Sequence, residues 1–144
     1  MNTKKIFTLI LIASSFFASA QQKQKVTKLP PEATTFLEAN FKGIQIQEMY
    51  KEAEGTTFKY EVKLANGAEV EFNNRGRWRE IESKTTTLAT TMLQPSVGAY
   101  IQKTYPNAKI TEIKKGNRFN FVKINDEINL QFDTEGNFYR IMPD

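Results

Sequence analysis

The chain has 144 residues, of which 40% are hydrophobic, and its 20 Lys and Arg against 16 Asp and Glu give a net charge of +4. It contains no Cys and no His. This composition excludes a disulfide framework, a Cys/His zinc site, a cysteine nucleophile and a Ser-His-Asp triad, and the length suits one compact domain or two small repeats.

Residues 1–20 have the three parts of a secretory signal peptide. Lys4 and Lys5 form a positive start, an apolar run covers residues 6–13, and Ala18-Ser19-Ala20 is an A-x-A cleavage site. The apolar run is shorter than the roughly 20 residues of a membrane-spanning helix. We therefore expect a periplasmic or secreted protein with no transmembrane segment after cleavage. Residues 21–28 are polar, and we expect this N-terminal segment to be disordered.

The remaining chain repeats itself. The first repeat covers residues 29–83, the second covers residues 93–144, and a Thr-rich connector, residues 84–92, joins them. Leu29-Pro30-Pro31 corresponds to Leu93-Gln94-Pro95, and the segment 72–81 corresponds to 132–141. The spacing between the copies shortens by four residues inside the segment 52–61, where a hairpin loop can change length without moving the core.

Each repeat begins with a short helix, because a proline at the first helical position is followed by apolar residues at helical spacing. These stripes are Ala33, Phe36, Leu37 and Phe41 in the first repeat, and Val97, Tyr100, Ile101 and Tyr105 in the second.

Each helix is followed by four strands, because the apolar residues then alternate with polar ones. The first repeat has strands starting near residue 44 and over residues 58–64, 68–72 and 77–82, and the second over residues 108–113, 119–125, 127–132 and 137–142. Asn66-Gly67 predicts a type I′ hairpin turn. Phe119 and Phe121 are out of phase with Val122, which predicts a bulge.

The fold class that follows is α+β. Two α-β-β-β-β units in tandem form one antiparallel sheet, with both helices packed on one face.

These residues resemble the PepSY-like, β-lactamase-inhibitor-like family of exported bacterial proteins. The pattern has two parts, and both repeats have them. The first part is Leu-x-Pro before a helix that ends in an aromatic residue, from Leu29 to Phe41 and from Leu93 to Tyr105. The second part is a strand pair leading into Phe-Asx-x-x-Gly-x-aromatic-x-x-Ile, in residues 72–81 and 132–141. The resemblance covers residues 29–144. It implies a tandem α-β4 fold with a concave open sheet, export to a periplasm such as that of Bacteroidetes-type bacteria, and no catalytic residues to transfer.

Candidate chemistry is sparse. Asp133-x-Glu135 and Asp126-Glu127 could form half of an acid/base pair or a calcium site, but turn chemistry is the stronger interpretation. Lys114, Lys115 and Arg118 surround a predicted hairpin tip and are interpreted as a solvated loop. We predict no catalytic residue, no cofactor and no metal, so the protein is not expected to be an enzyme.

The aromatic pair Trp78 and Phe138 gives the candidate site. Residues three apart on a strand point to opposite faces, so if Ile81 and Ile141 face the helices, the two rings face away beside Glu80 and Arg140. Exposed aromatic and arginine side chains anchor protein interfaces. The alternative is that a bulge after Gly76 or Gly136 rotates the strand and buries both rings.

We therefore predict a non-enzymatic binding module that engages a protein or peptide of the cell envelope through Trp78, Glu80, Phe138 and Arg140 on the open sheet face. The alternative is a carrier of a small ligand or envelope component, with a cavity lined by Phe36, Tyr60, Phe72 and Tyr100. Lys and Arg are interspersed with acids, so no nucleic-acid partner is predicted. We expect a monomer.

Overall fold

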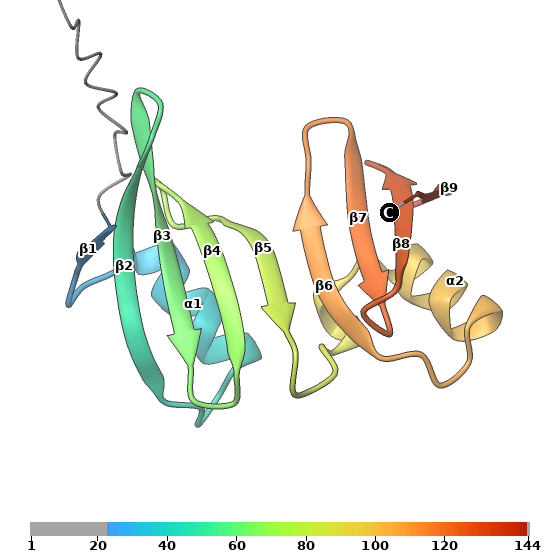
Figure 1. Ribbon diagram of the computed structural model, residues 1–144, viewed down its shortest axis with the longest axis horizontal. Helices are drawn as coiled ribbons and strands as arrows, with labels where there is room; N and C mark the ends of the chain where they lie inside the picture. Colours follow the sequence, from blue (N-terminus) through green and yellow to red (C-terminus); the bar gives the residue numbers. More distant parts are fainter. Residues whose placement is uncertain (1–22, 144) are drawn as a thin grey trace, which may run out of the picture.

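The computed structural model describes residues 23–143 as one sheet with two α-helices and a short 3-10 helix (Figure 1). The elements in chain order are β1 Lys23–Lys25, α1 Pro31–Asn40, β2 Ile46–Glu54, β3 Thr57–Leu64, β4 Ala68–Asn73, β5 Trp78–Ser83, η1 Thr90–Met92, α2 Pro95–Thr104, β6 Ile110–Lys115, β7 Phe119–Ile124, β8 Ile128–Asp133 and β9 Phe138–Met142. The predicted signal peptide, residues 1–20, lies outside the described residues.

The nine strands form an antiparallel meander in which each strand pairs with its neighbours in sequence. Both helices lie behind the sheet in Figure 1, and the face toward the viewer is uncovered. The predicted α+β fold class, with both helices on one face of a single sheet, is confirmed. Within residues 23–143 no helix has the length and apolar character needed to cross a bilayer.

The core lies between the helices and the sheet. Pro31 and Pro95 occupy the start of their helices, where a missing N–H leaves no bond unmade. Leu37 of α1 and Ile101 of α2 are buried in the same core cluster as Phe72 and Phe132, which are fully buried on the sheet. The predicted helical stripes therefore face the sheet.

The hairpin turns differ between the repeats. Gly67 has φ +83°, but Asn66 is not at positive φ, so the predicted type I′ turn is wrong there. The Gly67 N–H donates to the Leu64 carbonyl at 3.0 Å, and Gly67 alone takes the left-handed conformation. The second repeat has Asn125 and Asp126 at φ 54° and 58°, so the type I′ requirement is met in that hairpin.

Two further predictions are corrected. Residues 23–25 of the segment expected to be disordered form β1, because backbone pairing with residues 50–52 of β2 needs no apolar side chains, and the Lys23 Nζ lies 2.8 Å from a Glu61 carboxylate oxygen. The bulge predicted near Phe119 is absent from β7, whose pairing with β8 is continuous. Phe119 and Phe121 instead point to the uncovered face.

Both repeats place a glycine turn against the first turn of their helix. Gly76 and Gly136 have φ +86° and +87°. A Cβ at Gly76 would lie 2.9 Å from the Ala33 backbone nitrogen, whereas one at Gly136 would meet the ends of the Ser96 and Gln94 side chains, which can rotate away. The positive φ favours glycine at both turns, and Gly76 is also required for its small size.

Gly76→Ala should therefore destabilise the fold more than Gly43→Ala. Gly43 also has positive φ, at +78°, but an added Cβ meets nothing within 4 Å. We expect a loss of about 1–2 kcal/mol for Gly43→Ala from backbone strain, and about 1–3 kcal/mol more for Gly76→Ala from the clash with α1. Urea unfolding measures both, and equal losses would show that the turn does not press on the helix.

Candidate functional site

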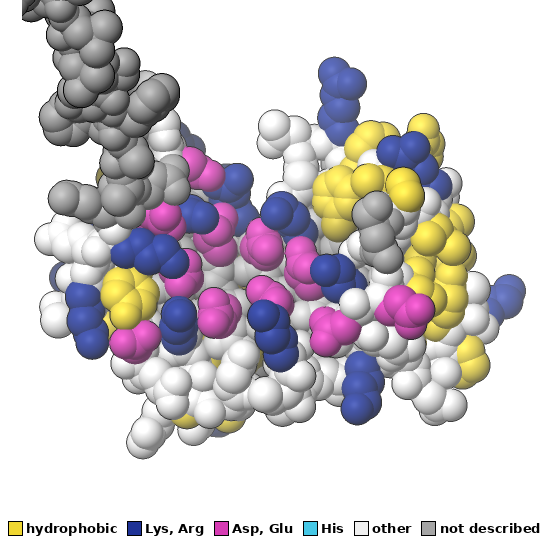
Figure 2. All heavy atoms as spheres, in the orientation of Figure 1, with side chains coloured by type: hydrophobic (Ala, Val, Ile, Leu, Met, Phe, Trp, Pro, Cys, Tyr) yellow, Lys and Arg dark blue, Asp and Glu magenta, His cyan; other side chains and the backbone are white. Residues whose placement is uncertain are grey.

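The uncovered face of the sheet is a lattice of charged side chains. Figure 2 shows carboxylates gathered over its middle, with Lys and Arg around and between them. Side chains alternate between faces along a strand, so this face receives the residues that lie between the buried ones. On β4, for example, Glu69 and Glu71 alternate with the buried Ala68, Val70 and Phe72.

The strand register aligns six glutamates into two rows that cross the strands. The first acidic row consists of Glu61, Glu71 and Glu80. The second acidic row consists of Glu69, Glu82 and Glu112. Side chains directly opposite each other on antiparallel strands are about 4.5–5.5 Å apart at Cβ, and like charges in these positions destabilise a sheet. The fold therefore places repelling carboxylates side by side on four neighbouring strands.

The first acidic row is held by lysines. Its ion pairs are Glu61–Lys23 at 2.8 Å, Glu71–Lys59, and Glu80–Lys114 at 2.8 Å. The hydrogen bond to the carboxylate raises the pKa of each of these three lysines. These ammonium groups therefore stay charged across the physiological pH range.

The second acidic row is paired more loosely. Its nearest cations are Lys63 at 3.8 Å from Glu69, Lys84 at 3.6 Å from Glu82, and Lys123 at 3.4 Å from Glu112. These distances exceed a good charge-assisted hydrogen bond. The carboxylates of the second acidic row are therefore freer than those of the first to take another cationic partner.

Carboxylates of both rows surround a shallow hollow of about 150 Å³ over Val70. Its acidic lining is Glu61, Glu69, Glu71, Glu80 and Glu82. No group of three acidic side chains within residues 23–143 is arranged to hold a metal ion. Five carboxylates therefore meet at the centre of this face, and each has a lysine partner at its outer side or along the strands.

Glu80 and Arg140, two of the four predicted site residues, lie on this uncovered face. Glu80 belongs to the first acidic row. Arg140 pairs with Gln131 on β8, and its Nε donates to the Gln131 Oε1 at 2.8 Å. Glu80 and Arg140 lie at the same level across the sheet, since Lys114, Phe121 and Gln131 connect them in register.

Trp78 lies on the helix side, so its predicted outward orientation is wrong and the bulge alternative is correct. The register shifts at this point, because Trp78 pairs with Phe72 whereas Glu80 pairs with Glu71. The extra residue rotates the strand and brings the indole to 5.7 Å from the Phe36 ring. The Lys115 Nζ lies 3.7 Å from the Trp78 ring centroid, and burial lowers the pKa of this lysine.

Phe138 repeats this arrangement in the second copy. It pairs with Phe132, next to a register shift equivalent to the one at Trp78. Its ring stacks on the Tyr100 ring, and the two ring centroids are 4.5 Å apart. Each of the four residues of the predicted carrier cavity packs against another aromatic ring, and Phe36 also lines an open cavity of about 560 Å³ together with Trp78. The ring centroids of Phe36 and Phe72 are 5.9 Å apart, and those of Tyr100 and Phe132 are 5.5 Å apart.

Sequence reasoning missed an aromatic corner on the uncovered face, formed by Phe119, Phe121 and Tyr139. The Phe119 and Tyr139 rings are 4.9 Å apart, and Tyr139 is exposed. Hydrophobic side chains gather at the upper right of Figure 2, over this end of the sheet. The signal was present in Phe119 and Phe121, whose phase opposes that of Val122.

The side chain of Asp133 stabilises the turn between β8 and β9 by accepting hydrogen bonds within it. Its Oδ1 accepts hydrogen bonds from the backbone N–H of Glu135 at 3.0 Å and of Asn137 at 2.8 Å. Its Oδ2 accepts a bond from the Asn137 side chain, and that bond lowers the pKa of Asp133. Asn73 accepts the same two backbone bonds in the first copy.

The family can be assigned from the sequence. A family model described as "Putative beta-lactamase-inhibitor-like, PepSY-like" matches residues 58–140. The chain belongs to this PepSY-like family. The match spans β3 to β9 and includes both Phe-Asx-x-x-Gly turns. A comparison with curated proteins found no match.

Solved structures share the fold of this PepSY-like chain. A "putative calcium-regulated periplasmic protein" from Bacteroides thetaiotaomicron is 25% identical, with a TM-score of 0.79 over 84% of this chain and 97% of that one. A "putative periplasmic protein of unknown function" from Bacteroides vulgatus is 25% identical, with a TM-score of 0.79 over 85% of this chain and 100% of that one. A DUF2874 protein from Bacteroides vulgatus, at 24% identity, has a TM-score of 0.80 over 86% and 99%.

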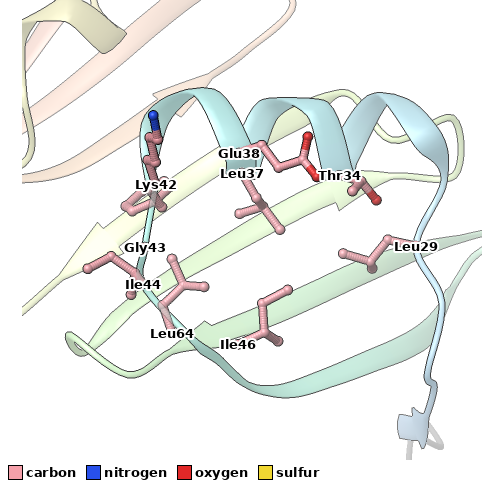
Figure 3. A pocket seen from close by; sticks show the side chains of 10 residues that line it. Leu29, Thr34, Leu37, Glu38, Lys42, Gly43, Ile44, Ile46 and Leu64 are labelled. Carbon is pink, nitrogen blue, oxygen red and sulfur yellow. The ribbon is translucent and has the colours of Figure 1, made fainter.

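The PepSY-like chain also has an apolar groove on the helix side, of about 360 Å³. Figure 3 shows side chains from α1 and from the sheet converging on it. Its apolar walls are Leu29, Leu37, Phe41, Ile44, Ile46 and Leu64. This groove is separate from the two acidic rows, which lie on the opposite face of the sheet.

The position of Trp78 predicts its effect on stability. We expect Trp78→Ala to lower the free energy of unfolding by about 2–3 kcal/mol, because a half-buried ring in contact with Phe36 is lost. Tyr139→Ala, which truncates an exposed ring, should change it by less than about 1 kcal/mol. Chemical denaturation measures both variants. Similar small losses would place Trp78 outside the core.

The like-charge register predicts that Glu82→Gln stabilises the protein. Glu82 faces Glu69 on one side and Glu112 on the other, so its neutralisation should raise the free energy of unfolding by about 0.5 kcal/mol at low salt. Glu80→Gln is the matched control, and it should not stabilise, because it weakens the 2.8 Å pair with Lys114. Thermal unfolding at two salt concentrations distinguishes the variants. A destabilised Glu82→Gln variant would contradict the repulsion.

Proposed function

We propose that this protein is an exported, non-enzymatic binding module whose open sheet face engages a basic segment of a partner protein in the cell envelope. The observation that supports this most strongly is the pair of acidic rows on a face that no helix covers. Export is supported by the predicted signal peptide and by the periplasmic structural relatives.

The acidic rows favour a cationic partner on energetic grounds. Like charges opposite each other on a sheet disfavour folding, so their retention on four adjacent strands calls for an opposing benefit. A partner that places Lys or Arg between the carboxylates removes this repulsion in the complex. Electrostatic complementarity of this kind also speeds association.

The spacing within a row suits a helix. Adjacent strands are about 4.8 Å apart, and residues i and i+4 on a helix are about 5–6 Å apart. A helix lying across the strands can therefore bring lysines at every fourth position close to Glu69, Glu82 and Glu112. The aromatic corner is in register with the first acidic row instead, because Phe121 pairs with Lys114 and Lys114 pairs with Glu80. It therefore lies beside such a helix, where an apolar side chain of the partner could contact it.

One structural relative is described as calcium-regulated. Calcium binds carboxylate oxygens, so at the acidic rows it would compete with a basic helix for the same groups. A calcium arm in the binding experiment therefore tests whether ions reach this face.

The proposed function is tested with an alanine-based helical peptide that has lysine at every fourth position. We expect saturable binding by fluorescence anisotropy that weakens with added salt, since exposed charges are screened. The variant Glu69→Gln/Glu82→Gln should bind roughly fivefold more weakly, as expected from two surface charge pairs. Calcium at millimolar concentration should reduce binding if it occupies the rows.

The matched control is Asp126→Asn/Glu127→Gln, which changes the charge equally at the hairpin between β7 and β8. This control should bind the peptide as the unaltered protein does. Equal weakening in both variants would show attraction to net charge alone, and unchanged binding in the Glu69/Glu82 variant would exclude the rows.

A further inference from the structure

The second repeat has its first strand covered by the connector. The Leu88 N–H donates to the Ile110 carbonyl at 2.8 Å, and the Ile110 N–H donates to the Thr87 Oγ1 at 3.0 Å. The Leu88 side chain is buried with the core. An extended segment with a hydroxyl followed by a leucine thus closes the beginning of β6 and leaves Ile110 only 2% exposed.

Ile46 holds the same position in the first repeat. It pairs with Leu64 as Ile110 pairs with Ile124, and the same register shift follows both residues. Its surroundings differ, because Ile46 is 42% exposed. Within residues 23–143, no segment makes at Ile46 the backbone contacts that Leu88 makes at Ile110.

The path of the chain explains this difference. The connector continues past β5 alongside the beginning of β6, and η1 then packs against α2. In the first repeat, β1 pairs with residues 50–52, the Val26 N–H bonds the Met49 carbonyl, and the chain then enters α1 at Pro31. The beginning of β2 therefore stays open beside the apolar groove.

The groove and this open strand edge lie together. Ile46 lines the groove, as does Ile44, which is 37% exposed. Figure 3 shows Ile46 at the beginning of β2, Ile44 on the loop that leads into this strand, and Leu37 above them on α1. An apolar recess beside an unpaired strand edge is the arrangement by which a sheet accepts an added extended peptide, because main-chain bonds and a side-chain pocket are offered at once.

We propose that this groove binds an extended segment of a partner protein, with an aliphatic side chain in the groove and the backbone of that residue bonded to the Ile46 carbonyl. The occupant has the chemistry of Thr87-Leu88, a hydroxyl residue followed by a leucine-like residue. This site lies on the helix side and does not depend on the binding proposed for the acidic rows.

The probe is a fluorescein-labelled peptide with the connector sequence of residues 84–92, Lys-Thr-Thr-Thr-Leu-Ala-Thr-Thr-Met. We expect saturable binding by anisotropy, with amide chemical shifts in NMR that change around Leu37, Phe41 and Ile46. Ile46→Asp should weaken binding at least tenfold, and a peptide with the Leu88→Asp change should not bind. Ile141→Asp is the matched control, because Ile141 is the same residue type and is 54% exposed on β9. The Ile141→Asp variant should bind the connector peptide as tightly as the unaltered protein does.

Several results would overturn the proposal. One is that the unaltered protein shows no saturable binding of the connector peptide, while circular dichroism shows that the Ile46→Asp and Ile141→Asp variants are folded. Another is equal affinity for the Ile46→Asp and unaltered proteins. Shift changes confined to Ile110 would show exchange with the protein's own connector instead. Self-association that Ile46→Asp abolishes would assign the groove to a second copy, and binding of decanoate but not of the peptide would assign it to an acyl chain.

Discussion

The contact between each glycine turn and the first turn of its helix is the constraint on which the rest of the structure depends. Gly76 packs on Pro30 and Ala33 with no room for a Cβ, which fixes the helix over the end of its hairpin. The strand leaving the turn begins with a bulge, so its aromatic residue, Trp78, lies under the helix. Regular alternation then resumes and leaves Glu80 on the uncovered face. The turn at Gly76 thus determines where α1 lies, on which face the Trp78 ring lies, and on which face Glu80 joins the first acidic row.

The sequence predicts the repeat, the helices and the meander, because each rests on local periodicity and turn chemistry. It does not predict the face on which Trp78 lies, since a single extra residue reverses the parity of a strand. Burial of a large ring gains about 1.5–3 kcal/mol, and this gain favours the bulged register. The acidic rows were also missed, because Glu82 and Glu112 become neighbours only when the two repeats pair. β1 was missed because backbone pairing leaves no side-chain pattern.

The two faces of the sheet have opposite roles in stability. On the helix side, buried residues such as Phe72 and Phe132 provide the apolar burial that holds the fold. On the uncovered face, opposed glutamates act against folding, and ion pairs with lysines such as Lys59 and Lys114 act in the opposite direction. A chain selected for stability alone would alternate the charges across the strands. Local features that oppose folding are concentrated at functional surfaces, which is why we propose the acidic rows, rather than the aromatic pair, as the binding surface.

The two repeats also show how a duplicated unit comes to leave a surface open. The second repeat is completed by β5 and by the connector, which close the beginning of β6. The first repeat has β1 at the corresponding edge, which reaches only residues 50–52. Terminal units of repeat proteins ordinarily present a polar outer surface for solubility. Ile44 and Ile46 remain apolar at this edge, and exposed apolar residues gathered beside a groove indicate a surface that another chain covers.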